Sequence, residues 1–401
     1  MKKICLLILV LAFAVTGCTG EAAVSPAPTE GTKIEPMVEY GWTDGTSPVP
    51  NKRVGLVRAG VNCIYHAVSP TGVYFLDITD GGDSYIVYAD DGSDTFIKLC
   101  GRPDCTHNTA DCNAYVPSGC ALSYYGGYLY VGSGDYSLSR EAKLTRMDPD
   151  GANHVTLMDL NKFAKENGGD FAKCNIITGG FCLFTVFGWE VVSQGPDHTE
   201  KKTTSKGQYY YKLDGSMEAP ERANIDGLAC YHCGDAFLVH NPIPVEGSKY
   251  GSYYDWNPDT NSSSFLTPHP GQPGWYGQKE GYYFQDGYIY RCTYAANKTE
   301  PVVDTGLVGS YIVFAFPDCL VLASNDREAT DNNLYFYNWS FELIDTVCVP
   351  NPNLLRTNFL LIAETAERLF LTTSFDGIPT SYINKSELGT GDVKIYPFHF
   401  Q

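Results

Sequence analysis

Residues with metal-binding or thiol chemistry gather in one short segment of the chain. Cys100, Cys105, His107 and Cys112 follow one another closely, and Cys120 comes soon after them. Thiolate and neutral imidazole are the preferred ligands of zinc. Cysteines at such spacings can also form disulfides that hold a long irregular loop together. The segment is therefore a candidate for a metal site, for disulfides or for free thiols.

The spacing favours disulfides among these three states. Only Thr106 separates Cys105 from His107, so placing both side chains on one tetrahedral ion is awkward. A zinc knuckle keeps its histidine further from the neighbouring cysteines. We therefore predict a loop stapled by disulfides, with no bound metal and no other cofactor. Zinc on the three cysteines and His107 is the second interpretation.

Two other segments offer aromatic side chains that are suited to sugars or to protein partners. Tyr253, Tyr254 and Trp256 lie in the first of them, and Trp275 lies in the second. We take these four residues as a candidate ligand surface. The alternative use of each ring is packing inside the fold.

No recognised catalytic motif accompanies these residues. The sequence has no P-loop, no HExxH and no G-x-S-x-G. Its 46 acidic residues nevertheless leave room for carboxylates that meet only in the folded chain. No catalytic residue is therefore assigned.

The elements that must position these residues follow a repeat. An apolar strand, a tight turn and a second strand rich in aromatic and aliphatic residues recur seven times, with turns at Gly72, Gly127, Gly180, Asp235, Gly281, Asp318 and Glu367. Each copy is followed by a second hairpin, at a mean spacing of about 49 residues. Four strands per copy are typical of propeller blades.

The predicted fold is all-β, a seven-bladed β-propeller of four-stranded antiparallel blades over residues 51–401. An eight-bladed ring that includes residues 38–65 is the alternative. We expect a strand over residues 53–58 to close the ring on blade seven, and a short helix over Asn161–Asn167. The cysteine segment would link blade one to blade two and lie beside the channel mouth, as part of a binding face.

The start of the chain indicates where the protein works. Met1-Lys2-Lys3 precedes an apolar run too short to span a bilayer, and the run ends in Val15-Thr16-Gly17-Cys18. This ending resembles the lipobox of bacterial lipoproteins. The resemblance implies a signal peptide over residues 1–17 and a lipid on the sulfur of Cys18. Residues 18–50, rich in Pro, Thr and Ser, read as a flexible tether.

Composition narrows the range of partners. The formal net charge is −18, and such a field repels phosphate backbones and anionic lipid headgroups. Nucleic acid is therefore excluded as an expected partner, and the membrane is reached through the lipid anchor. Cys182 and Cys319 lie in apolar strand patterns, where we expect buried thiols.

The sequence of the repeats also resembles that of known propellers. Arg146-Met-Asp-Pro-Asp-Gly151 is similar to repeats of the Tol-system periplasmic protein and of uncharacterised lipid-anchored propellers, and the cysteine segment resembles a loop of the latter. The resemblance implies an extracytoplasmic propeller that binds an extracellular protein or glycan without catalysis. The alternative is a propeller enzyme that cleaves glycosides or peptides with carboxylates at the channel mouth.

Overall fold

The computed structural model describes residues 57–58 and most of residues 66–401. Residues 1–56 and 59–65 lie outside the described part, as do shorter segments such as 135–140, 325–332, 350–359 and 373–377. The predicted signal peptide, Cys18 and the tether are among them, so these assignments stay predictions. Within the part that is described, no helix is both long and apolar enough to cross a membrane.

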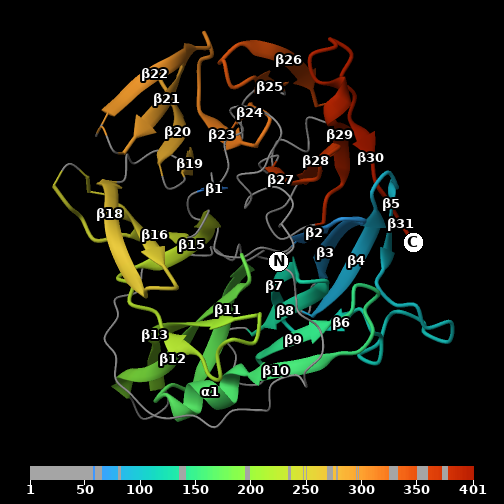
Figure 1. The fold of residues 1–401 in the computed structure, drawn as a ribbon, viewed down its shortest axis with the longest axis vertical. Helices are drawn as coiled ribbons and strands as arrows, with labels where there is room; N and C mark the ends of the chain where they lie inside the picture. Colours follow the sequence, from blue (N-terminus) through green and yellow to red (C-terminus); the bar gives the residue numbers. More distant parts are fainter. Residues whose placement is uncertain are drawn as a thin grey trace, which may run out of the picture.

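Seven β-sheets are arranged in a ring (Figure 1). Blade one contains β2 (His66–Ser69), β3 (Gly72–Ile78), β4 (Ser84–Asp90) and β5 (Thr95–Lys98). Blade two contains β7 (Gly119–Tyr125), β8 (Tyr128–Ser133), β9 (Lys143–Met147) and β10 (Val155–Asp159). Blade three contains β11 (Phe171–Thr178), β12 (Phe181–Gln194), β13 (Thr199–Lys212) and β14 (Glu221–Arg222).

The remaining blades repeat this order. Blade four contains β15 (Leu228–Cys233), β16 (Ala236–Asn241), β17 (Ser252–Asn257) and β18 (Ser262–Pro268). Blade five contains β19 (Gly274–Tyr276), β20 (Glu280–Gln285), β21 (Tyr288–Thr293) and β22 (Lys298–Asp304). Blade six contains β23 (Tyr311–Ala315), β24 (Leu320–Ser324), β25 (Asn333–Tyr337) and β26 (Leu343–Cys348). Blade seven contains β27 (Leu360–Glu364), β28 (Arg368–Thr372), β29 (Ser381–Asn384) and β30 (Tyr396–Pro397).

The protein is a seven-bladed β-propeller. Each of the seven repeats seen in the sequence forms the first two strands of one blade, and each second hairpin forms the last two. The seven-bladed prediction is therefore confirmed, and the eight-bladed alternative is not.

The blades pack against one another through both faces of their inner strands. All five residues of β23 are buried, and so are all five of β28. The outer strand β22, in contrast, contains only exposed and half-buried residues. A strand that is covered on both faces reads as a continuous apolar run, which explains the aromatic and aliphatic composition. Both thiols are buried, as expected: Cys182 lies in β12, and Cys319 lies in the turn immediately before β24.

The one α-helix of the described chain, α1 (Leu160–Glu166), lies where the sequence predicts a helix. The Asp159 carboxylate caps its first turn by accepting the backbone N–H of Lys162 at 2.9 Å. The helix ends at Asn167, and Phe163 packs against Phe184 of blade three. A short 3₁₀ helix, η1 (Lys385–Glu387), follows β29.

The ring closes differently from the prediction. β31 (His399–Phe400) pairs in parallel with β5, so the C-terminal end bridges blade seven and blade one. β1 (Val57–Arg58) pairs with β19 of blade five and is drawn near the centre of the ring in Figure 1. The prediction that this segment joins blade seven is therefore wrong. The outer edge of blade seven is already taken by β30.

Candidate metal centre

Both ends of the cysteine loop, defined as residues 100–113, lie beside the same strand of blade one, β4. The backbone N–H of Leu99 donates to the carbonyl of Ile86 in β4 at 2.9 Å. The N–H of Ile86 in turn donates to the carbonyl of Ala114 at 2.8 Å. β6 (Tyr115–Val116) then continues along the edge of β4. Both ends of the loop are thus fixed at one residue.

This attachment places the loop on the outer rim of the ring. The loop does connect the outer part of blade one to β7 of blade two, as predicted. Figure 1 draws the segment between β5 and β6 at the outer edge, away from the centre. The expectation of a place beside the channel mouth is therefore wrong, because the loop follows the edge of β4 instead of crossing directly between the blades.

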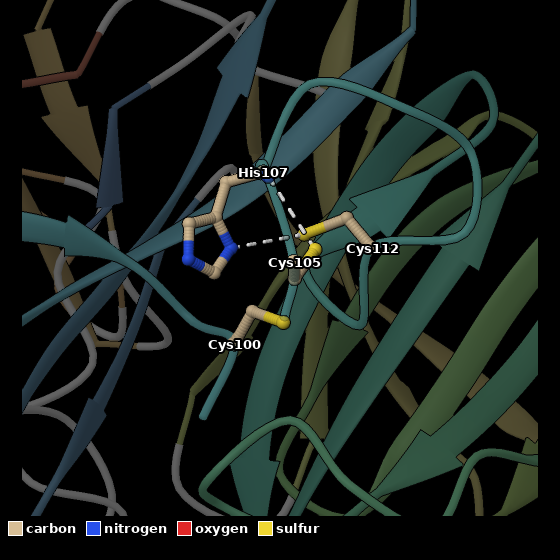
Figure 2. A group of neighbouring side chains, drawn as sticks. All are labelled: Cys100, Cys105, His107 and Cys112. Carbon is tan, nitrogen blue, oxygen red and sulfur yellow. Dashed lines mark hydrogen bonds between the residues drawn. The ribbon is translucent and has the colours of Figure 1, made fainter. Parts of the chain in front are cut away.

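Four potential ligands meet inside the loop (Figure 2). One ligand atom from each of Cys100, Cys105, His107 and Cys112 lies within 4.8 Å of the others. Cys112 is buried and the other three side chains are half-buried. The residues between them are exposed, namely 101–104, 106 and 108–111. The loop therefore turns its donors inward and its other side chains outward.

A left-handed residue solves the spacing problem between Cys105 and His107. His107 has φ 55°, a conformation that reverses the chain immediately after Thr106. The backbone N–H of His107 donates to Cys105 Sγ at 3.4 Å, and its Nδ1 lies 3.7 Å from Cys112 Sγ. The argument that one intervening residue keeps these two side chains from a common ion does not hold for this loop.

The cysteines are free in the structure, in contrast to the predicted disulfides. Cys100, Cys105, Cys112 and Cys120 are all unbonded to another sulfur. Three of the sulfurs, those of Cys100, Cys105 and Cys112, instead converge with the imidazole of His107. Cys120 does not belong to the group, because its thiol is buried against blade three and donates to the carbonyl of Cys174 at 3.1 Å.

Two cations that the sequence analysis did not single out support the loop. Lys98 Nζ donates to the carbonyl of His107 at 2.7 Å. The Arg102 guanidinium donates to the carbonyl of Asp111 at 2.7 Å and lies 3.5 Å from the Asp104 carboxylate. In the sequence, Lys98 and Arg102 could have been identified as basic residues that lie next to cysteines in a chain that is otherwise acidic.

The environment separates the pKa values of two of the thiols. Burial acts to raise the pKa of Cys100, but hydrogen bonds from the backbone N–H groups of Arg102 and Asn113 outweigh it and lower the pKa to about 7. Burial, together with the neighbouring sulfurs, raises the pKa of Cys112 to about 11. The loop therefore favours thiolate at Cys100 first.

The candidate aromatic surface is largely core. Tyr253 and Trp256 in β17 have no exposed surface. The Trp256 ring packs against Tyr210 and Phe237 at 5.2 and 5.4 Å between ring centroids. Its indole N–H donates to the side chain of Asn261 at 3.2 Å. The prediction of a ligand surface is therefore wrong for Tyr253 and Trp256.

The other two aromatic residues have different positions. Tyr254 is half-buried and packs edge-on against Phe265 at 5.5 Å. Trp275 lies in β19, where its backbone pairs with Arg58 and with Tyr282. The side chain of Trp275 is outside the described part. Of the three rings that the structure describes, only that of Tyr254 is partly exposed, so Tyr253, Tyr254 and Trp256 do not form one surface.

Comparison with known proteins adds no family. No protein-family model and no curated protein matches this chain. Solved structures are similar to this chain at low sequence identity. The β-propeller domain of the Trilobed protease from Pyrococcus furiosus is 12% identical with a TM-score of 0.40, over 73% of this chain and 82% of that one.

Two further similar structures carry the names of enzymes. The acylaminoacyl peptidase of Pyrococcus horikoshii is 10% identical with a TM-score of 0.43, over 90% of this chain and 54% of that one, so this chain spans about half its length. Dihydro-heme d1 dehydrogenase NirN is also 10% identical with a TM-score of 0.43, over 93% and 82%. At these TM-scores the matches carry no argument about this chain, so its function must be argued from its own residues.

Proposed function

We propose that this protein is a non-enzymatic binding propeller that recognises an extracellular protein or glycan, held outside the cytoplasmic membrane by a lipid on Cys18. The observation that carries the proposal is the cysteine loop. Most of its exposed side chains on the rim are polar, while its four donor side chains converge on the inside. Function concentrates on loops that a rigid scaffold holds in place.

The exposed side chains of the loop suit a polar partner. Arg102 and Asp104 carry opposite charges, and Asn108, Thr109 and Asp111 offer hydrogen-bonding groups. The backbone beneath them is anchored at Ile86 of β4. A loop anchored in this way loses little further conformational entropy when a partner binds, which favours affinity.

The enzyme alternative would need two carboxylates that are available to a substrate. Glu364 and Asp318 do approach each other between blades six and seven, but both contact the amine of Lys385. Lys385 thereby links the two blades and offsets one of the two negative charges. This contact therefore supports a structural use of Glu364 and Asp318.

Binding can be tested on arrays of bacterial and host glycans and by pull-down from cell-envelope extracts, with the full-length protein in detergent. Asn108→Ala combined with Thr109→Ala should weaken binding of a captured partner at least tenfold. The matched control, Ser262→Ala with Ser264→Ala, changes exposed polar residues of β18 on blade four. Equal binding by both double variants would contradict the assignment of the loop as the binding element.

A further inference from the structure

We propose that the cysteine loop binds one Zn²⁺ ion through three sulfurs and one imidazole nitrogen. The ligands are Cys100, Cys105, His107 and Cys112. The site is structural, because four protein ligands complete the tetrahedral coordination of zinc and leave no position open for a substrate. The inference concerns what folds the loop, and it stands whether or not the loop binds a partner.

The geometry of the four donors matches a zinc centre. Zinc binds sulfur at about 2.3 Å and nitrogen at about 2.0 Å, so tetrahedral ligand atoms lie about 3.5–3.8 Å apart. His107 Nδ1 and Cys112 Sγ are already 3.7 Å apart. Since all four donors lie within 4.8 Å of one another, an ion at their centre requires displacements of about an ångström or less.

Backbone N–H groups surround the sulfurs as they do around thiolate ligands. The N–H of His107 donates to Cys105 at 3.4 Å. Cys100 accepts from the N–H groups of Arg102 and Asn113, and Cys112 accepts from that of Ala114. Such donors stabilise a negatively charged sulfur more than a neutral thiol. Each of the three sulfurs therefore accepts at least one backbone N–H bond that can stabilise it as a metal-bound thiolate.

The charges of the loop also suit a divalent ion. Three thiolates and a neutral imidazole around Zn²⁺ carry a net charge of about −1. Arg102 interacts electrostatically with Cys100 and Cys105, and Lys98 is bonded to the carbonyl of His107. These two cations offset the remaining negative charge. Three thiolates without the ion would leave a larger excess of negative charge in a half-buried site.

The ion would connect the rim loop to the core between two blades. Cys112 belongs to the same buried cluster as Leu99 and Ala114 at the base of the loop and Leu122 and Leu129 of blade two. Cys100 and Cys105 pack against this cluster. Zinc would therefore fix the exposed part of the loop relative to both blades.

The direct test is metal analysis of the full-length protein purified in detergent without chelators. We expect one zinc per chain by inductively coupled plasma mass spectrometry. Cys105→Ser and His107→Ala should each lower the content at least fivefold. Cys348→Ser and His154→Ala are the matched controls, because both residues are exposed and lie outside the loop. Zinc loss in the controls, or none in the loop variants, would overturn the proposal.

A second measurement does not depend on variants that fold. Replacing zinc with Co²⁺ in the wild-type chain should give the absorption of tetrahedral cobalt bound to thiolates. Chelator alone should accelerate alkylation of Cys100, Cys105 and Cys112 at least tenfold, because thiolate ligands react once the ion leaves. Alkylation that requires a reductant would show disulfides, and immediate alkylation of all three would show free thiols. Either result would overturn the proposal.

These outcomes separate the two proposals. Zinc content is measured without any partner, so absence of the ion would refute the metal site and leave recognition by the propeller open. A chain that holds zinc but binds no partner would retain the metal site and contradict the proposed function.

Discussion

The seam of the ring depends on one aromatic residue from the C-terminal end. Phe398 is 7% exposed and lies between β30 and β31. Its ring centroid is 4.6 Å from that of Phe96 in blade one. It is 4.8 and 5.7 Å from those of Tyr382 and Phe370 in blade seven. Phe398→Ala therefore removes contacts on both sides of the seam.

The expected cost follows from burial. Truncation of a buried phenylalanine to alanine costs about 3–5 kcal/mol, because a cavity adds to the lost transfer free energy. Phe400, two residues further on, is 48% exposed and stacks on Phe96 at 5.5 Å. The half-exposed Phe400 ring gains about half as much transfer free energy from burial as the Phe398 ring, and its removal leaves no closed cavity. Phe400→Ala should therefore cost about 1–2 kcal/mol. The pair forms a matched comparison of the same substitution.

Thermal denaturation followed by circular dichroism can measure the difference. The unfolding entropy of about 2.1 cal/mol/K per residue makes 1 kcal/mol worth roughly 1.4 °C for a propeller of this size. Phe398→Ala should then lower the Tm by about 4–7 °C, and Phe400→Ala by about 2 °C. Equal shifts for the two variants would refute the argument that the seam is closed by the ring of Phe398.

Three further changes test other parts of the molecule. Cys18→Ala should leave an unprocessed precursor or release the protein into the aqueous phase, and a processed protein that still partitions into detergent would contradict lipidation. Trp256→Ala should lower the free energy of unfolding, measured by denaturant titration, by about 3–5 kcal/mol, because the indole ring is buried in the core. The zinc content of this variant should equal that of the wild type. Lys385→Met should cost about 3–5 kcal/mol by leaving the Glu364 carboxylate buried without its cation. Adding Glu364→Gln should recover part of this loss, and a purely additive double-mutant cycle would argue against the ion pair.

The blades could be predicted from sequence because their pairing is local. The turn between β7 and β8 holds Gly126 and Gly127 at φ 56° and 84°, a conformation that glycine adopts without strain. The first two strands of each blade pair across a turn of two to four residues, and their apolar faces fix the register. The seam is different, since β31 and β5 lie at opposite ends of the described chain and no local pattern links them.

The aromatic prediction failed for a reason that lies in the position of β17 within its blade. Tyr253 and Tyr254 are adjacent and thus point to opposite faces of the sheet, so a strand with one solvated face would expose one of them fully. β17 has β16 on one side and β18 on the other. Neighbouring structure covers its faces, leaving Tyr253 buried and Tyr254 half-buried. Composition alone does not separate such a strand from a binding surface.

The cysteine loop shows which part of a site sequence can supply. Its donor types were evident, but their convergence depends on two features that spacing does not encode. One is the left-handed backbone of His107, a conformation that costs a non-glycine residue free energy and persists only where surrounding contacts stabilise it. The other is the double hydrogen bond of Ile86, which brings Leu99 and Ala114 to the same point of β4. Zinc bonds to His107 and its neighbours would supply the stabilisation that the left-handed conformation requires.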